Sequence, residues 1–139
     1  MIRRALLLLA LASLLGACSN PSATPAPSLA SLAPRPSSPA TVRILEPENG
    51  ATISTTTAHI VLELNGATII TETNVAIRPD QGHVHLYVNN QLVSMNYGLE
   101  QDIPVVPGTL VLRAEFVAAD HAPFNPRVQS NEVVFTDKQ

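Results

Sequence analysis

Three of the four histidines in this chain of 139 residues occur in patterns that suit metal binding. His83 and His85 stand two residues apart in the stretch GHVHLYV, and His121 follows Asp120 in the stretch DHAPFNP. Side chains two apart on a strand project to the same side, with Cα atoms about 6.5–7 Å apart, so two imidazoles could reach one ion. Imidazole suits copper and zinc, and either ion would need three or four ligands in total.

Two further side chains could complete such a site. Asp120 could be a fourth ligand or an acceptor that orients an imidazole, and Met95 is a soft ligand that would favour Cu(I). The alternative is that His83 and His85 are solvated strand positions beside Tyr87 that bind nothing. This alternative stays open, because the same spacing also occurs on the polar face of an ordinary sheet.

The remaining histidine and the rest of the chain carry no pattern typical of an enzyme. His59 lies on another predicted strand and is expected at the surface without a role. No serine occupies a nucleophile elbow, and there is no phosphate-binding glycine loop and no His-Glu-x-x-His pair. We therefore expect a non-catalytic protein.

Alternation of apolar and polar residues runs through residues 42–139 and predicts strands. We expect them at 42–45, 51–54, 57–64, 68–72, 83–88, 91–95, 101–106, 109–118 and 131–136. Turn dipeptides separate them, and Asn89-Asn90 suits a tight hairpin because Asn tolerates a positive φ. Short antiparallel strands at this spacing predict an all-β fold, a single β-sandwich.

The N-terminal residues 1–17 predict a secretory signal peptide. A basic pair precedes an apolar run at 5–15, which is shorter than the roughly 20 residues that span a bilayer. The stretch LGAC ending at Cys18 resembles the lipobox of bacterial lipoproteins. That resemblance implies cleavage before Cys18 and lipid attachment to its thiol, which fits a chain with a single cysteine.

Residues 18–41 are rich in Pro, Ser and Ala and predict a disordered linker between the lipid and the domain at 42–139. The expected location is the bacterial cell membrane or outer membrane, with the domain facing the periplasm or the exterior. The membrane, through the lipid on Cys18, is therefore one partner. All eleven acidic residues lie in the domain, which has no basic patch, so nucleic acid is not expected to bind.

Two resemblances concern the domain. The stretch VRILEPENGATIS resembles the first strand and turn of bacterial immunoglobulin-like (Ig-like) and fibronectin-like modules. Residues 82–136 resemble a family of bacterial periplasmic proteins with a Gly-His-His-His strand, a Pro-Gly turn and a His-x-Pro loop. The matching stretches are Gly82 to His85, Pro107-Gly108 and His121 to Pro123, with Val84 in place of the middle histidine.

These resemblances imply an Ig-like sandwich in which strands 83–88 and 109–118 are antiparallel neighbours. The start of the first strand then lies beside the end of the second, which brings His121 near His83 and His85. The expected function is a cell-envelope lipoprotein with an Ig-like domain that acts as a non-catalytic binding or structural module. The alternative is a copper- or zinc-binding protein that uses the three histidines, with Asp120 beside them.

Overall fold

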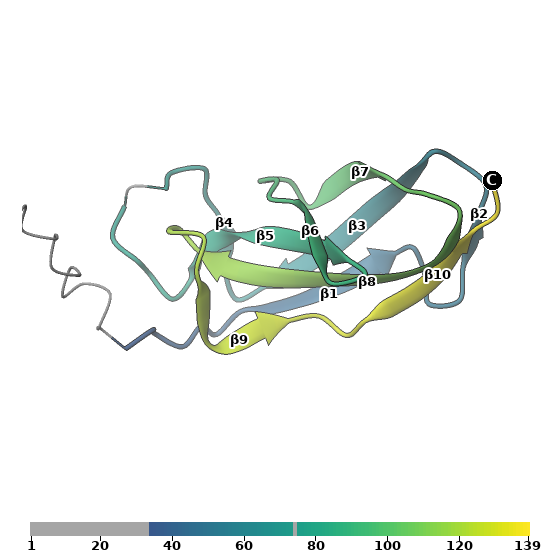
Figure 1. Cartoon of the computed structure of the whole chain (residues 1–139). Coiled ribbons are helices and arrows are strands. Elements are labelled where there is room, and N and C mark those ends of the chain that lie inside the picture. Colours follow the sequence, from purple (N-terminus) through teal and green to yellow (C-terminus); the bar gives the residue numbers. More distant parts are fainter. Residues whose placement is uncertain (1–33, 74) are drawn as a thin grey trace, which may run out of the picture. The chain divides into compact units, whose positions relative to one another are not determined.

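The structure is a computed structural model that describes residues 34–73 and 75–139. Its compact unit, Pro34–Gln139, consists of strands and loops (Figure 1). The strands are β1 (Thr41–Glu46), β2 (Thr52–Ile53), β3 (Thr57–Asn65), β4 (Thr68–Ile69), β5 (Gln81–Val88), β6 (Gln91–Ser94), β7 (Glu100–Pro104), β8 (Gly108–Ala118), β9 (Pro123–Gln129) and β10 (Val133–Asp137). Within the described residues, no helix has the length and apolar character needed to cross a membrane.

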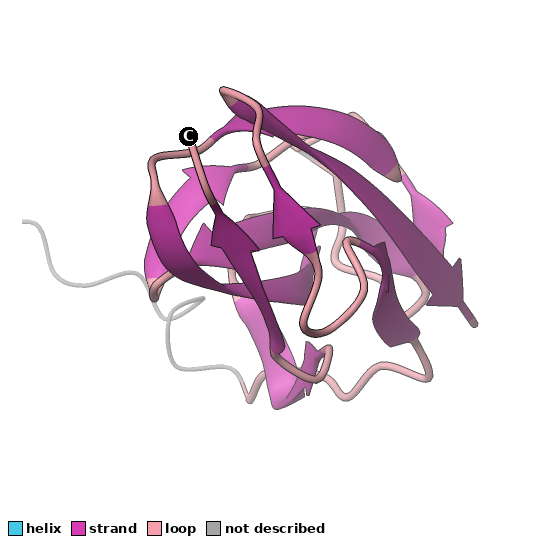
Figure 2. Cartoon of the chain, turned by 90° about the vertical axis from the view of Figure 1, so that its right-hand side faces the viewer, coloured by secondary structure: helices cyan, strands magenta, loops and turns pink. Residues whose placement is uncertain are grey.

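The strands form two sheets that pack face to face (Figure 2). One sheet has the order β1-β3-β7, and the other has the order β2-β10-β8-β5-β4, with β6 also paired to β5 and β9 to β8. Most pairs are antiparallel, whereas β2–β10 and β4–β5 are parallel. The triplets β1-β3-β7 and β10-β8-β5 reproduce the strand order of an Ig-like sandwich. The predicted fold class is therefore confirmed.

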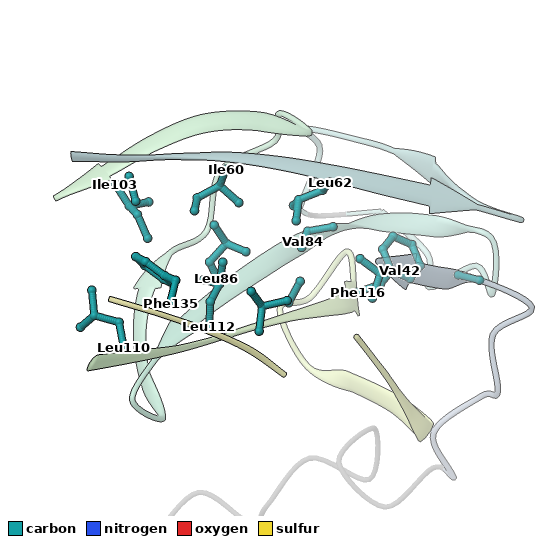
Figure 3. Close-up of a cluster of buried hydrophobic side chains, with 14 of the residues drawn as sticks. Val42, Ile60, Leu62, Val84, Leu86, Ile103, Leu110, Leu112, Phe116 and Phe135 are labelled. Carbon is teal, nitrogen blue, oxygen red and sulfur yellow. The ribbon is translucent and has the colours of Figure 1, made fainter. Parts of the chain in front are cut away.

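Apolar side chains from the facing sides of the two sheets fill the core (Figure 3). Ile60 of β3, Leu86 of β5 and Leu112 of β8 are fully buried. They lie on the faces that the alternation of residues predicted, because side chains on a strand alternate between its two sides. Phe124 stacks on Phe116 with ring centroids 5.5 Å apart and adds β9 to the same core.

Strand β9 is missing from the predicted set. Its sequence contains Pro123 and Pro126, and a proline cannot donate a hydrogen bond to a neighbouring strand. The structure accommodates both because β9 pairs only with β8, at an edge of its sheet. The prolines are therefore compatible with a strand here, although they argued against one in the sequence.

The compact unit begins at Pro34, eight residues before the domain boundary expected at residue 42. The carbonyl of Pro36 accepts a hydrogen bond from the Asn125 amide at 3.0 Å. The Pro39 carbonyl lies only 2.8 Å from the position that a Cβ on Gly66 would take. Residues 34–41 contact the rest of the domain through backbone atoms, the Arg35 side chain and the buried Ala40, and these few contacts form no alternating apolar pattern in the sequence.

The structure does not test the other predictions for the N-terminal part of the chain. The signal peptide at 1–17, the lipidated Cys18 and the linker as far as residue 33 lie outside the described residues.

Candidate metal centre

Three imidazole nitrogens meet at one end of the β5–β8 strand pair. Nε2 of His83 lies 2.8 Å from Nδ1 of His121 and 3.2 Å from Nε2 of His85. Nε2 of His85 lies 3.3 Å from Nδ1 of His121, which closes the triangle. The predicted proximity of the three histidines is confirmed. We call these three residues the histidine cluster.

The register of β5 and β8 determines where the first two histidines lie. His83 pairs with Val117 and His85 pairs with Glu115, on the face of the sheet opposite the core. The preceding residue, Gly82, lies close against the backbone of β8. A Cβ on Gly82 would lie 1.9 Å from the carbonyl oxygen of Val117, so only glycine allows this approach beside the histidine cluster.

The third histidine comes from the turn between β8 and β9, residues 119–122. The His121 amide donates to the Ala118 carbonyl at 2.9 Å, and the Ala118 amide donates to the Ala122 carbonyl at 3.1 Å. His121 has a φ of 62°, at the turn position that usually holds glycine. For a residue with a Cβ this conformation costs about 1–2 kcal/mol. The strained backbone directs the imidazole toward His83 and His85.

The expectation that His83 and His85 could be solvated strand positions is wrong. Their exposed fractions are 0% and 4%, and the Tyr97 ring packs edge-on against His83 with centroids 5.3 Å apart. Burial, and then the neighbouring His121 and His85, lower the pKa of His83 to about 4. Burial followed by His121 also lowers the pKa of His85. Both rings are therefore neutral at pH 7, which is the form that binds metals.

Hydrogen bonds alone cannot satisfy three ring nitrogens that all touch one another. A ring nitrogen of a neutral imidazole is either a donor or an acceptor, never both. In a closed triangle, at least one contact must therefore join two donors or two acceptors. On the other side of its ring, Nδ1 of His83 is buried without a hydrogen-bond partner among the described residues. A cation bound by all three lone pairs would remove the conflict within the triangle.

Asp120 is adjacent to His121 in sequence, but its carboxylate lies against Arg35. The guanidinium of Arg35 donates to the two carboxylate oxygens at 2.6 and 3.0 Å, and this contact lowers the pKa of Asp120. The Ala122 amide donates to the same carboxylate at 3.2 Å. The structure thus engages Asp120 within the turn and does not bring it into the histidine cluster.

The other candidates from the sequence lie at the surface. Met95, considered as a soft ligand, is 50% exposed in the loop after β6. His59 is exposed on β3, as predicted, and its Nδ1 lies 2.9 Å from the Asp102 carboxylate.

Sequence reasoning missed the ion pair between the buried Glu115 and the half-exposed Arg127, beside the histidine cluster. The alternation of residues along β8 places Glu115 on the face away from the core, yet it is fully buried. Arg127 of β9 donates to its two carboxylate oxygens at 2.6 and 2.5 Å. The signal was lost with β9 itself, because the partner strand that covers Glu115 was not predicted.

Comparison with known proteins adds little to this geometry. No protein-family model and no curated protein matches the chain. Among solved structures, the chain is similar to the fibronectin(III)-like modules of Clostridium thermocellum CbhA. The two share 14% sequence identity with a TM-score of 0.46, over 71% of this chain and 98% of that chain.

Proposed function

We propose that this protein binds one transition-metal ion, zinc or copper, through His83, His85 and His121. The observation that carries the proposal is the mutual contact of three imidazole nitrogens at 2.8, 3.2 and 3.3 Å. No arrangement of protons satisfies all three contacts, whereas one cation does. An Ig-like domain with such a site acts as a binding module and needs no catalytic group.

The separations between the nitrogens suit a tetrahedral ion. Around zinc, with Zn–N distances of about 2.0–2.1 Å, nitrogen ligands lie about 3.3 Å apart. Two of the three separations are 3.2 and 3.3 Å. An ion about 2.05 Å from all three nitrogens would sit about 1 Å outside their plane, which leaves a fourth position for another ligand.

Rigidity and burial also support this function. His83 and His85 are on a central strand of the larger sheet, so little conformational entropy remains to be lost when they bind an ion. Their lowered pKa values keep protons from competing with the metal near neutral pH.

Calorimetric titration of the full chain with Zn(II) and with Cu(II) tests the proposal. We expect one ion per chain with micromolar or tighter affinity, and a loss of about 100-fold or more in His85→Ala. His59→Ala is the matched control, because it removes an exposed histidine from another strand and should leave the affinity unchanged. Absence of binding to the unaltered chain, or equal losses in both variants, would contradict the proposal.

We also infer that the protein is exported and held at a bacterial membrane by lipid on Cys18. Support comes from the lipobox-like LGAC stretch and the preceding apolar run. Cys18→Ala should move the protein from the detergent phase to the aqueous phase in a partition experiment, whereas Ser19→Ala should not. Detergent partitioning that survives Cys18→Ala would refute the anchor.

A further inference from the structure

Arg35 binds the turn that carries His121, although it lies 85 residues before Asp120 in the sequence. Its guanidinium donates two hydrogen bonds to the Asp120 carboxylate, at 2.6 and 3.0 Å. It donates two more to the backbone oxygens of Ala122 at 2.9 Å and Pro123 at 3.0 Å. The partners of this guanidinium thus lie on both sides of His121.

These four hydrogen bonds restrain a backbone that would otherwise relax. The φ of 62° at His121 is an unfavourable conformation, and such residues persist only where their surroundings hold them in place. Asp120 adds a further restraint, because its carboxylate also accepts the Ala122 amide at 3.2 Å. Among the described residues, Arg35 is the group that ties this turn to the chain segment preceding β1.

We infer that Arg35 is a positioning residue for the histidine cluster, and that docking of residues 34–36 on the β8–β9 turn regulates the affinity of the metal site. The inference rests on the proposed function and adds a regulator to the same site. Arg35 touches none of the three imidazoles and acts on His121 through the turn. When the segment is released, the turn loses its restraint and His121 moves away from His83 and His85.

The coupling must act in both directions. The Pro36 carbonyl accepts the Asn125 amide at 3.0 Å, so this hydrogen bond reports whether the segment is docked. Because thermodynamic linkage is reciprocal, a bound ion stabilises the docked segment by the same factor by which docking raises metal affinity. Binding of a metal ion thus stabilises the docked position of residues 34–36, which follow residues 1–33 in the chain.

Zn(II) titration of the full chain and its Arg35 variants tests the inference. We expect Arg35→Ala to weaken zinc binding by about 10–100-fold, as the loss of outer hydrogen-bond partners does in metal sites. Arg35→Lys keeps the charge without the forked geometry and should lie between Arg35→Ala and the unaltered chain. Arg43→Ala is the matched control, because Arg43 forms an exposed ion pair with Glu63 at 3.3 Å, and it should bind zinc normally.

Two additional measurements separate positioning from general loss of structure. Amide hydrogen exchange at Asn125 should slow when zinc binds to the unaltered chain, and this response should vanish in Arg35→Ala. Asp120→Asn keeps the size of the side chain while removing its charge, and it should weaken zinc binding without abolishing the thermal transition. This second variant provides the test if Arg35→Ala fails to fold.

The outcomes distinguish this inference from the proposed function. If the unaltered chain binds no zinc, both fall. If it binds zinc and His85→Ala does not, while Arg35→Ala and Asp120→Asn bind within about twofold of the unaltered chain, only the positioning role falls. If the rate of amide hydrogen exchange at Asn125 does not change when zinc binds, the coupling between docking and metal binding is refuted, while the proposed function stands.

Discussion

The two ends of the β5–β8 strand pair both contain residues in the left-handed region, yet the conformations have different causes. At one end, Asn89 and Asn90 form the β5–β6 turn with φ values of 51° and 65°. Asn tolerates this region, and the Asn89 side chain accepts the Val111 amide at 3.0 Å. The tolerance of Asn for this region and one hydrogen bond to β8 are sufficient to explain this turn.

At the other end, His121 has a similar φ of 62° but directs its side chain to two rings on another strand. Glycine or asparagine would form the same turn at lower cost. The difference is that Asn tolerates the left-handed region, whereas a histidine held there at a cost points to a role elsewhere, here in the histidine cluster. Four predictions test this contrast between a structural end and a functional end.

The largest expected effect is that of His121→Gly. Metal affinity should fall by about 100-fold or more, equivalent to about 2.7 kcal/mol, because one of three ligands is lost. The free energy of unfolding of the metal-free protein should stay unchanged or rise by up to about 1 kcal/mol, because glycine relieves the strain at this φ. Calorimetry and urea denaturation measure the two quantities. If the variant keeps its metal affinity, or if its free energy of unfolding falls, His121 does not have the functional role that distinguishes its end of the strand pair.

A steric change at Gly82 should destabilise the functional end by about 2–3 kcal/mol. In Gly82→Ala, the new Cβ would meet the Val117 carbonyl oxygen at 1.9 Å, so β5 and β8 would have to separate. Gly98→Ala is the control, because its new Cβ would lie 3.2 Å from the nearest atom, the backbone oxygen of Glu100. This variant should lower the free energy of unfolding by less than about 1 kcal/mol. Urea denaturation compares the two variants, and equal losses would show that the close approach at Gly82 is not needed.

Acid should weaken the metal-free fold through His83. Its pKa is about 4 in the folded protein, below the usual 6.5, so the unfolded chain binds a proton that the folded protein excludes. Stability should therefore fall as the pH drops from about 6.5 to about 4, by on the order of 2 kcal/mol, with no contribution above that range. Urea denaturation across this range measures the loss, which should shrink in His83→Gln.

His59 provides the control for that pH dependence because its shift has the opposite sign. Hydrogen bonding to Asp102 raises the pKa of His59, so its contribution to stability is present in acid and is lost as the pH rises through the folded pKa. His59→Ala should therefore keep or deepen the acid loss. An unchanged acid response in His83→Gln would assign that response to other groups.

The smallest expected effect belongs to the structural end. Asn90→Gly should change the free energy of unfolding by no more than about 0.5 kcal/mol, because glycine also accepts a positive φ. Metal affinity should not change, since the turn lies at the opposite end of the strand pair. Calorimetry and denaturation check both points, and a shift in metal affinity would mean that the two ends are coupled.

Much of the framework follows from the sequence by itself, because strand geometry imposes a period of two. The alternation in β3, β5 and β8 identified the core faces, including Ile60, Leu86 and Leu112. The Asn89-Asn90 turn follows from the conformations that Asn tolerates. Once an Ig-like order was expected, the neighbouring β5 and β8 also brought His121 toward His83 and His85.

Only the tertiary structure decided what is buried on the outer face of that sheet. Alternation assigns His83, His85 and Glu115 to the side away from the core, and it carries no information on what packs over them. The ion pair between Glu115 and Arg127 depends on β9. The sequence did not predict this strand, because it contains two prolines. Arg35 was equally invisible, because a contact between residues 85 positions apart depends on how the chain folds back on itself and leaves no local pattern.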